Sequence, residues 1–203
     1  MNEHQLQILS EAKKNILNIF TTKINPLFVF HNLHHTEQVV SAAEEIGEFY
    51  QLDDNDQFVL FISAWFHDSG FSSGHIQEHE KESVKLVSDF LQYQKTGQKI
   101  IAKVSSCIQA TRLPQAPINL VEKIICDADL YHLGTKNFSI MNACLKQELQ
   151  NYYKINLSDE EWYQDNIEFL RLHQYFTGYC REKLEPIKQE WIEQMINEKK
   201  VIA

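Results

Sequence analysis

A histidine and an aspartate stand next to each other, as His67 and Asp68, where a strongly apolar stretch of the chain ends. Residues 58–66 are apolar nearly all round, which predicts a central, buried helix. Neighbouring side chains in a helix point about 100° apart, but at a helix end both can turn toward one ion. An imidazole nitrogen beside a carboxylate oxygen suits a divalent transition metal of intermediate softness. Alone, the dipeptide is weak evidence for a metal site, because a histidine that caps the end of a helix explains it as well or better.

Two further groups of metal-ligand residue types flank this dipeptide in the sequence. Upstream, His31, His34 and His35 lie at the start of another predicted helix. Downstream, Asp127 and Asp129 lie near the end of the apolar stretch 121–130, where an unpartnered buried carboxylate would cost several kcal/mol. A metal ion is a good partner for such a carboxylate. Three helix ends that carry histidine, histidine–aspartate and aspartate can therefore form one four-ligand site.

The elements that must position these residues all read as helices. Apolar residues recur at helical spacing through most of the chain. The predicted helices cover about residues 6–20, 36–50, 58–66, 80–93, 99–110, 120–130, 138–153 and 159–200, the last stretch opened by a capping box at Ser158 and Glu161. The Gly/Ser/His stretch 71–78 and the proline-flanked stretch 112–117 are predicted loops. We expect one all-α domain over residues 1–203, a helical bundle with a motif-bearing core at about 25–135 and a helical extension at about 136–203.

Composition narrows the class of protein. The chain has 203 residues, of which 43% are apolar, 6 are Gly and 4 are Pro, which is typical of a globular, mainly helical domain. A net charge of −9 argues against a protein that wraps nucleic acid. No apolar run is long enough to span a membrane, the N-terminus lacks the pattern of a secretory signal, and the four scattered cysteines fit a reducing compartment. We therefore expect a cytoplasmic protein with no nucleic-acid or membrane partner.

Taken together, the motif blocks resemble the HD superfamily of metal-dependent phosphohydrolases. The blocks are His31-Asn32-x-x-His35-Thr36, Ala64-Trp65-Phe66-His67-Asp68-Ser69-Gly70, His79-Glu80-x-x-Ser83, and Asp127-Ala128-Asp129-Leu130 with Leu133-Gly134. Their order and spacing match the family from about residue 31 to 134. The resemblance implies an HD-type helical domain that holds a divalent metal ion with His35, His67, Asp68 and Asp129. It also implies hydrolysis of phosphate esters or anhydrides, often of nucleotides.

The resemblance decides between neighbouring candidates. His35 is preferred to His34 because the family's ligand precedes threonine and follows Asn32 by three residues. His34 is then expected to support a ligand or to face water. Asp129 is preferred to Asp127 because it directly precedes Leu130; Asp127 would then hold a ligand's other nitrogen or face water. The ion could be Mn, Fe, Zn, Co, Ni or Mg.

Whether the site holds one metal ion or two depends on His79 and on residues 108–112. His79 stands where two-metal members of the superfamily often place a ligand for a second ion, but the usual further histidine is missing from residues 108–112. We therefore expect one ion. His79 and Glu80 would lie near the substrate, as a proton shuttle or phosphate contact, or else His79 simply starts a helix. His31 could contact phosphate or serve local hydrogen bonds, and Arg112 could bind phosphate or be an exposed loop residue.

The resulting hypothesis is a single-metal phosphohydrolase acting on a small phosphorylated substrate, such as a nucleotide. Asp68 would be a ligand that can also accept a proton from water, and His79 would protonate the leaving oxygen. The alternative is a non-catalytic, metal-binding HD module that senses nucleotides. The aromatic residues of the last third indicate core positions or a face that forms a homodimer.

Overall fold

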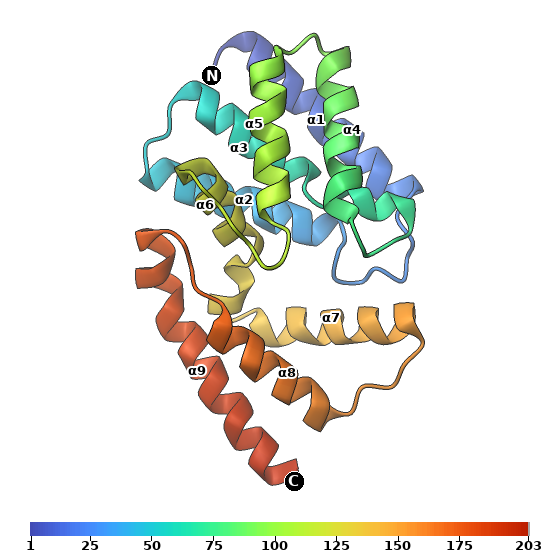
Figure 1. Cartoon of the computed structure of the whole chain (residues 1–203), viewed down its shortest axis with the longest axis vertical. Coiled ribbons are helices and arrows are strands. Elements are labelled where there is room, and N and C mark those ends of the chain that lie inside the picture. Colours follow the sequence, from blue (N-terminus) through green and yellow to red (C-terminus); the bar gives the residue numbers. More distant parts are fainter. Residues whose placement is uncertain (203) are drawn as a thin grey trace. The chain divides into compact units, whose positions relative to one another are not determined.

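The computed structural model describes residues 1–202, and side chains through residue 198 (Figure 1). Every regular element in this described part is a helix, so the all-α prediction is confirmed. The α-helices are α1 (Glu3–Thr22), α2 (Leu33–Phe49), α3 (Asp54–Phe66), α4 (His79–Tyr93), α5 (Gln98–Ala110), α6 (Leu120–Asp129), α7 (Phe138–Tyr153), α8 (Asp159–Leu172) and α9 (Gly178–Ile202). Two short 3₁₀ helices, η1 (Ser69–Ser73) and η2 (Tyr131–Gly134), follow α3 and α6. Ala203 lies outside the described residues.

The chain folds as two compact units. The first comprises Met1–Pro26 and His31–Asp129, and the second comprises Leu27–Phe30 and Leu130–Ala203. The four expected metal ligands all belong to the first unit. The expectation of a single domain stays a prediction. None of the described helices combines the length and apolarity needed to cross a membrane.

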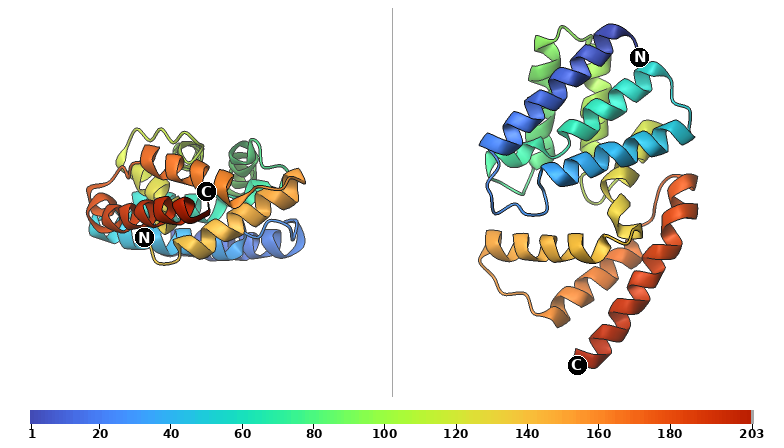
Figure 2. Two further views of the ribbon diagram at one scale, coloured as in Figure 1. Left: turned by 90° about the horizontal axis from the view of Figure 1, so that it is seen from below. Right: turned by 180° about the vertical axis from the view of Figure 1, so that it is seen from behind.

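Helix α3 is the centre of the first unit. It packs against α1, α2, α5 and α6, and Figure 2 shows α1 and α2 beside it from behind. Asp53 caps its first turn by accepting hydrogen bonds from the backbone N–H groups of Asn55 and Asp56. Every residue from Phe58 to Phe66 except Phe61 is buried. A helix apolar on all sides thus lies in the core and brings His67, at its end, into the interior.

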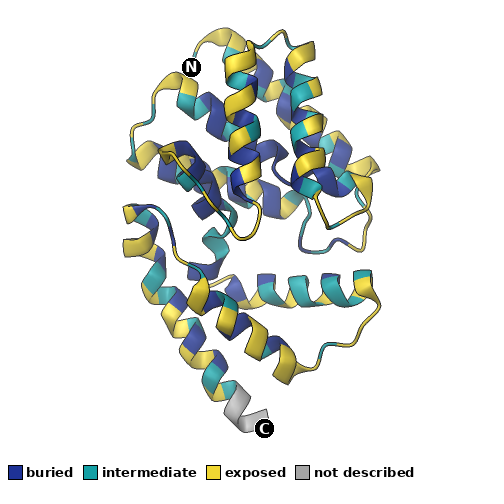
Figure 3. Ribbon diagram, viewed as in Figure 1, coloured by how far each residue is buried: buried dark blue, intermediate teal, exposed yellow. Residues whose placement is uncertain are grey.

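Helices α4 and α5 are amphipathic and close one side of this unit. The buried residues of α4 include Ser83, Val87 and Leu91, spaced four apart on one face. Figure 3 shows the outer sides of α4 and α5 exposed, in contrast to the buried α3. The start of α4 packs on η1, where a Cβ added to Gly70 would lie 1.9 Å from the carbonyl oxygen of His79. Only glycine permits this close approach of two backbones.

The second unit is built from η2, α7, α8 and α9. Its core contains Leu133, Phe138, Ile167, Leu170, Ile192 and Met195. The predicted capping box opens α8, with Ser158 and Glu161 bonded to each other's backbone N–H groups. Trp191 Nε1 of α9 donates a hydrogen bond to the carbonyl oxygen of Thr135 at 2.9 Å. This unit therefore has a core of its own.

Candidate metal centre

His35 reaches the site because of the way α2 begins. Asn32 is the N-cap of α2, and its side-chain oxygen accepts a hydrogen bond from the backbone N–H of His35 at 3.1 Å. The Asn-x-x-His spacing is therefore that of an N-cap and the third helical residue. His35 itself is 2% exposed, so its imidazole points inward from the first turn of α2. His34, one residue earlier, is exposed.

His67 and Asp68 lie at the other end of a buried helix. His67 is the C-cap of α3, and Asp68 precedes η1. His67 Nδ1 lies 2.8 Å from the carbonyl oxygen of Ala64, which can only accept a hydrogen bond, so Nδ1 carries the proton. The neutral imidazole then presents the lone pair of Nε2 to the interior, as a metal-ligating histidine does.

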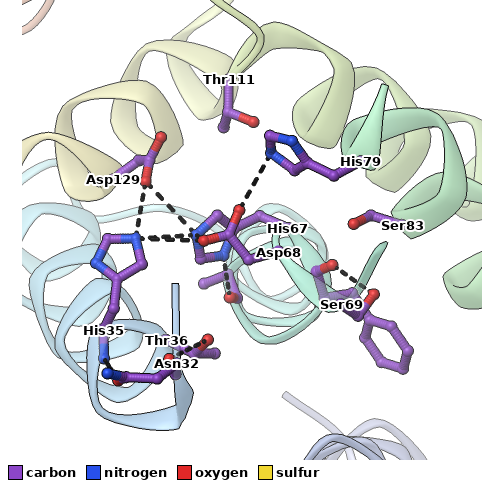
Figure 4. Close-up of polar contacts among 12 residues, drawn as sticks. Asn32, His35, Thr36, His67, Asp68, Ser69, His79, Ser83, Thr111 and Asp129 are labelled. Atoms are coloured by element: carbon purple, nitrogen blue, oxygen red, sulfur yellow. Dashed lines mark hydrogen bonds and ion pairs between the residues drawn. The ribbon is translucent and has the colours of Figure 1, made fainter. Parts of the chain in front are cut away.

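Asp129 completes the cluster from the last residue of α6. Its Oδ1 lies 3.2 Å from His35 Nε2 and 3.5 Å from His67 Nε2. Asp68 Oδ2 lies 3.1 Å from His67 Nε2 and 3.5 Å from His35 Nε2, and the two imidazole nitrogens are 3.4 Å apart. Figure 4 shows these four side chains pointing toward one another from three helix ends.

The spacing of these donor atoms suits one shared ion. Two atoms bonded to one metal at about 2.1 Å lie about 3.0 Å apart at a right angle and about 3.4 Å apart at the tetrahedral angle. The five measured separations fall between 3.1 and 3.5 Å. Asp68 Oδ2 is buried and has no hydrogen-bond partner. His35, His67 and Asp129 therefore offer ligand atoms close enough together to share one divalent ion. Asp68 Oδ2 lies beside the two imidazoles.

The electrostatics of the cluster favour a cation at its centre. Burial alone would lower the pKa of His67, but the carboxylates of Asp68 and Asp129 raise it well above its ordinary value. Burial would raise the pKa of Asp129, and hydrogen bonding and charge from His35 and His67 hold it well below its ordinary value. Without an ion, a proton on His67 supplies positive charge beside the two carboxylates.

His79 lies on the far side of the Asp68 carboxylate. Its Nε2 is 3.4 Å from Asp68 Oδ1 and 3.6 Å from Glu80 Oε1. Its Nδ1 donates a hydrogen bond to the carbonyl oxygen of Ile76 at 2.7 Å, which fixes the tautomer of the neutral ring. Burial lowers the pKa of His79, but Asp68 and Glu80 raise it, with a net shift upward. His79 is thus joined to the cluster through Asp68.

The other residues predicted for the site lie at its border, beside His79 or away from the cluster. The His31 ring lies 6.1 Å from the His35 ring, edge to face, at the border of the cluster. Glu80 is buried, and its carboxylate faces His79. Arg112 is exposed in the loop after α5. Asp127 is fully buried, so the alternative that it faces water is wrong.

Two residues near the cluster were not assigned a role from the sequence. Phe71, in η1, has its ring centroid 4.2 Å from those of both His31 and His79. Thr111, the buried C-cap of α5, lies between Asp129 and His79 in Figure 4. The stretch 108–112 lacks a histidine, and the position of Thr111 near the cluster depends on how α5 packs. Spacing alone gives no signal for either residue.

Comparisons with known proteins bear on the family and the fold. The family model described as HD domain matches residues 32–134, slightly more than half of the chain. The crystal structure of the Lin1889 protein from Listeria innocua is similar over 100% of both chains, with a TM-score of 0.62 and 17% identity. That of a predicted HD superfamily hydrolase from an uncultured Thermotogales bacterium covers 84% of this chain and 96% of its own, with a TM-score of 0.56 and 22% identity. At these identities the two structures show a shared fold. No curated protein matches the sequence.

Proposed function

Since the chain belongs to the HD domain family, we propose that it is a metal-dependent phosphohydrolase that acts on a small phosphorylated substrate, such as a nucleotide. The proposal assigns His35, His67, Asp68 and Asp129 as the ligands of one divalent ion. The observation that carries it is the convergence of their donor atoms, with five separations of 3.1–3.5 Å in a buried cluster. When bound, such an ion supplies an activated water and positive charge beside a phosphoryl oxygen.

Asp68 can serve two purposes because its two oxygens face different partners. Oδ2 lies among the ligating nitrogens, and Oδ1 faces His79 at 3.4 Å. A carboxylate in this position can hold the ion with one oxygen and pass a proton with the other. The proposal therefore makes Asp68 both a ligand and a catalytic residue.

His79 is proposed to protonate the leaving oxygen of the substrate. Asp68 and Glu80 raise the pKa of His79 against the effect of burial, which keeps the imidazole protonated to a higher pH. The side chain of His79 is 17% exposed and therefore reachable by a bound molecule. A protonated imidazole with access to solvent suits a general acid near neutral pH.

The substrate contacts follow from position. His31 borders the cluster and can donate to a phosphoryl oxygen. Glu80, predicted as a substrate contact, is better suited to act through His79, because its buried carboxylate faces that ring at 3.6 Å. Arg112 is exposed and can reach an anionic group only beyond the buried cluster. We propose it as a contact to the outer part of the substrate.

The net charge of −9 supports a free small molecule as the substrate, since long nucleic acids bind clustered positive charge. We also propose that the protein acts in the cytoplasm and binds neither nucleic acid nor a membrane. A homodimer formed through the aromatic C-terminal helices is proposed as well.

The test is a phosphate-release screen on the full chain. The protein is loaded in turn with Mn, Fe, Zn, Co, Ni and Mg and incubated with nucleoside mono-, di- and triphosphates, cyclic nucleotides and sugar phosphates. Release that is abolished in Asp129→Asn and kept in His34→Ala supports the proposal. His34 is the matched control because it is exposed and stands beside a ligand. Tight nucleotide binding without release from any substrate would instead favour the sensing module.

A further inference from the structure

Phe71 contacts both histidines that border the metal cluster. Its ring centroid lies 4.2 Å from that of His31, with 19° between the ring planes, and 4.2 Å from that of His79, with 30° between the planes. The two imidazoles are themselves 6.1 Å apart. The Phe71 side chain is completely buried. A fully enclosed ring that stacks on two half-buried imidazoles limits how far either of them can turn.

The backbone fixes Phe71 relative to Asp68. The Phe71 N–H donates a hydrogen bond to the carbonyl oxygen of Asp68 at 3.1 Å, within the turn that starts η1. One residue earlier, the Gly70 N–H donates to Ser83 Oγ of α4 at 2.8 Å. The same short helix thus holds the Asp68 carboxylate, the Phe71 ring and the first turn of α4, where His79 lies.

The imidazole of His79 is then held from three directions. Its Nδ1 is fixed by the carbonyl oxygen of Ile76, its Nε2 faces Asp68 Oδ1, and its face rests on Phe71. Removing the Phe71 ring would leave both polar contacts possible but would let the imidazole rotate about them. His31 loses its stacking partner in the same change.

We propose that Phe71 is a positioning residue that holds the imidazoles of His31 and His79 together beside the Asp68 carboxylate, ready to meet one phosphoryl group. Its effect on turnover rests on the function proposed above, whereas the restraint on the two rings does not. Phe71 is proposed to act through its contacts with the two histidines.

The experiment compares Phe71→Leu with Phe58→Leu. Both residues are buried phenylalanines of the first unit, with 0% and 2% exposure, so the two substitutions remove the same atoms from the same core. The first readout is the aromatic NMR spectrum of the full chain. In the wild type we expect nuclear Overhauser effects between the Phe71 ring and the ring protons of His31 and His79. We expect Phe71→Leu, and not Phe58→Leu, to shift the resonances of both histidines away from their ring-stacked positions.

The second readout is turnover by the metal-loaded protein. We expect Phe71→Leu to lower kcat about 10- to 100-fold with the metal content unchanged, because misplaced catalytic groups cost rate. Phe58→Leu should stay within about two-fold of the wild type. Phe71→Met, which fills similar space without a ring, serves if the leucine variant does not fold, and the wild-type Overhauser effects need no variant.

The two proposals fail in different ways. A wild-type protein that releases no phosphate contradicts the proposed function, and the ring restraint is then judged on the NMR spectrum alone. Unchanged histidine resonances in the Phe71 variants would overturn the inference. So would a loss of kcat no larger than that of Phe58→Leu in a protein that does turn over substrate.

Discussion

The carboxylate of Asp68 faces His79 with one oxygen, at 3.4 Å from Nε2, and His67 with the other, at 3.1 Å from Nε2. One side chain therefore connects a buried cluster of metal-ligand atoms to the largely buried imidazole of His79. This arrangement separates two roles that a single substitution can distinguish: holding an ion and moving a proton.

Replacing His79 should reduce turnover and leave metal binding intact. We expect His79→Gln to lower kcat by about 10²- to 10⁴-fold, the usual contribution of general acid–base catalysis. The bound metal should stay at the wild-type level, because His79 meets the cluster only through Asp68 Oδ1. Single-turnover phosphate release and elemental analysis of the same sample check both parts. Loss of the metal together with activity would contradict this division of roles.

Metal binding should release protons, and its affinity should rise with pH. The pKa of His67 in the metal-free protein is well above its ordinary value, because Asp68 and Asp129 outweigh the effect of burial. Below that raised pKa a proton occupies the imidazole, and the ion must displace it. Calorimetry in buffers of different ionisation enthalpy measures the protons released. Proton-independent binding at neutral pH would contradict the assignment of His67 as a ligand.

The asparagine–histidine spacing shows what the sequence could predict. Asn32 and His35 stand at the distance of an N-cap and the third helical residue, and the structure has that hydrogen bond. The end of the apolar stretch at Phe66 and the capping box at Ser158 were predicted correctly. Such features depend on neighbours within four residues, so a single sequence contains them.

Other features depend on where distant elements pack. Gly70 is required for space, since a Cβ there would meet the backbone of His79. The contacts of Phe71 with two histidines, and the burial of Asp127, arise only once α4 and α6 are in place. No local pattern distinguishes such residues from ordinary core positions.

Adding one methyl group at Gly70 should therefore destabilise the protein. The Cβ of Gly70→Ala would lie 1.9 Å from the His79 carbonyl oxygen and 2.8 Å from the Ser83 nitrogen, so backbone must move. We expect a loss of about 2 kcal/mol or more in the free energy of unfolding. Gly97→Ala, where no atom lies within 4 Å of the added Cβ, should change it by less than about 1 kcal/mol. Urea denaturation of both variants makes the comparison. Equal stabilities would contradict the close packing of η1 and α4.

The second unit should contribute a separate pH dependence through His173. Burial and the nearby Lys188 ammonium lower the pKa of His173 to about 4, and Lys188 Nζ donates to the His173 carbonyl oxygen at 2.7 Å. The unfolded chain binds a proton below about pH 6.5, whereas the folded chain does not until about pH 4. Protonation of His173 therefore leaves the free energy of unfolding unchanged above about pH 6.5. As the pH falls from there toward 4, it lowers that free energy by about 3 kcal/mol at most.

The check is the free energy of unfolding between pH 7 and 4 in the wild type, in His173→Gln and in His4→Gln. His4 is exposed and serves as the control. The wild type and His4→Gln should lose stability more steeply than His173→Gln over this range. Parallel curves for all three proteins would show that His173 is not held neutral by its surroundings.

Elemental analysis determines whether His35, His67, Asp68 and Asp129 hold one divalent ion. The full chain is soaked in each of Mn, Fe, Zn, Co, Ni and Mg, freed of excess metal, and compared with the double variant His67→Ala, Asp68→Ala and with the control His34→Ala. We expect about one equivalent of metal in the wild type and in His34→Ala, and none in the double variant. If the wild type retains no metal, or the double variant retains as much as the wild type, the assigned site and the hydrolase function built on it are both wrong.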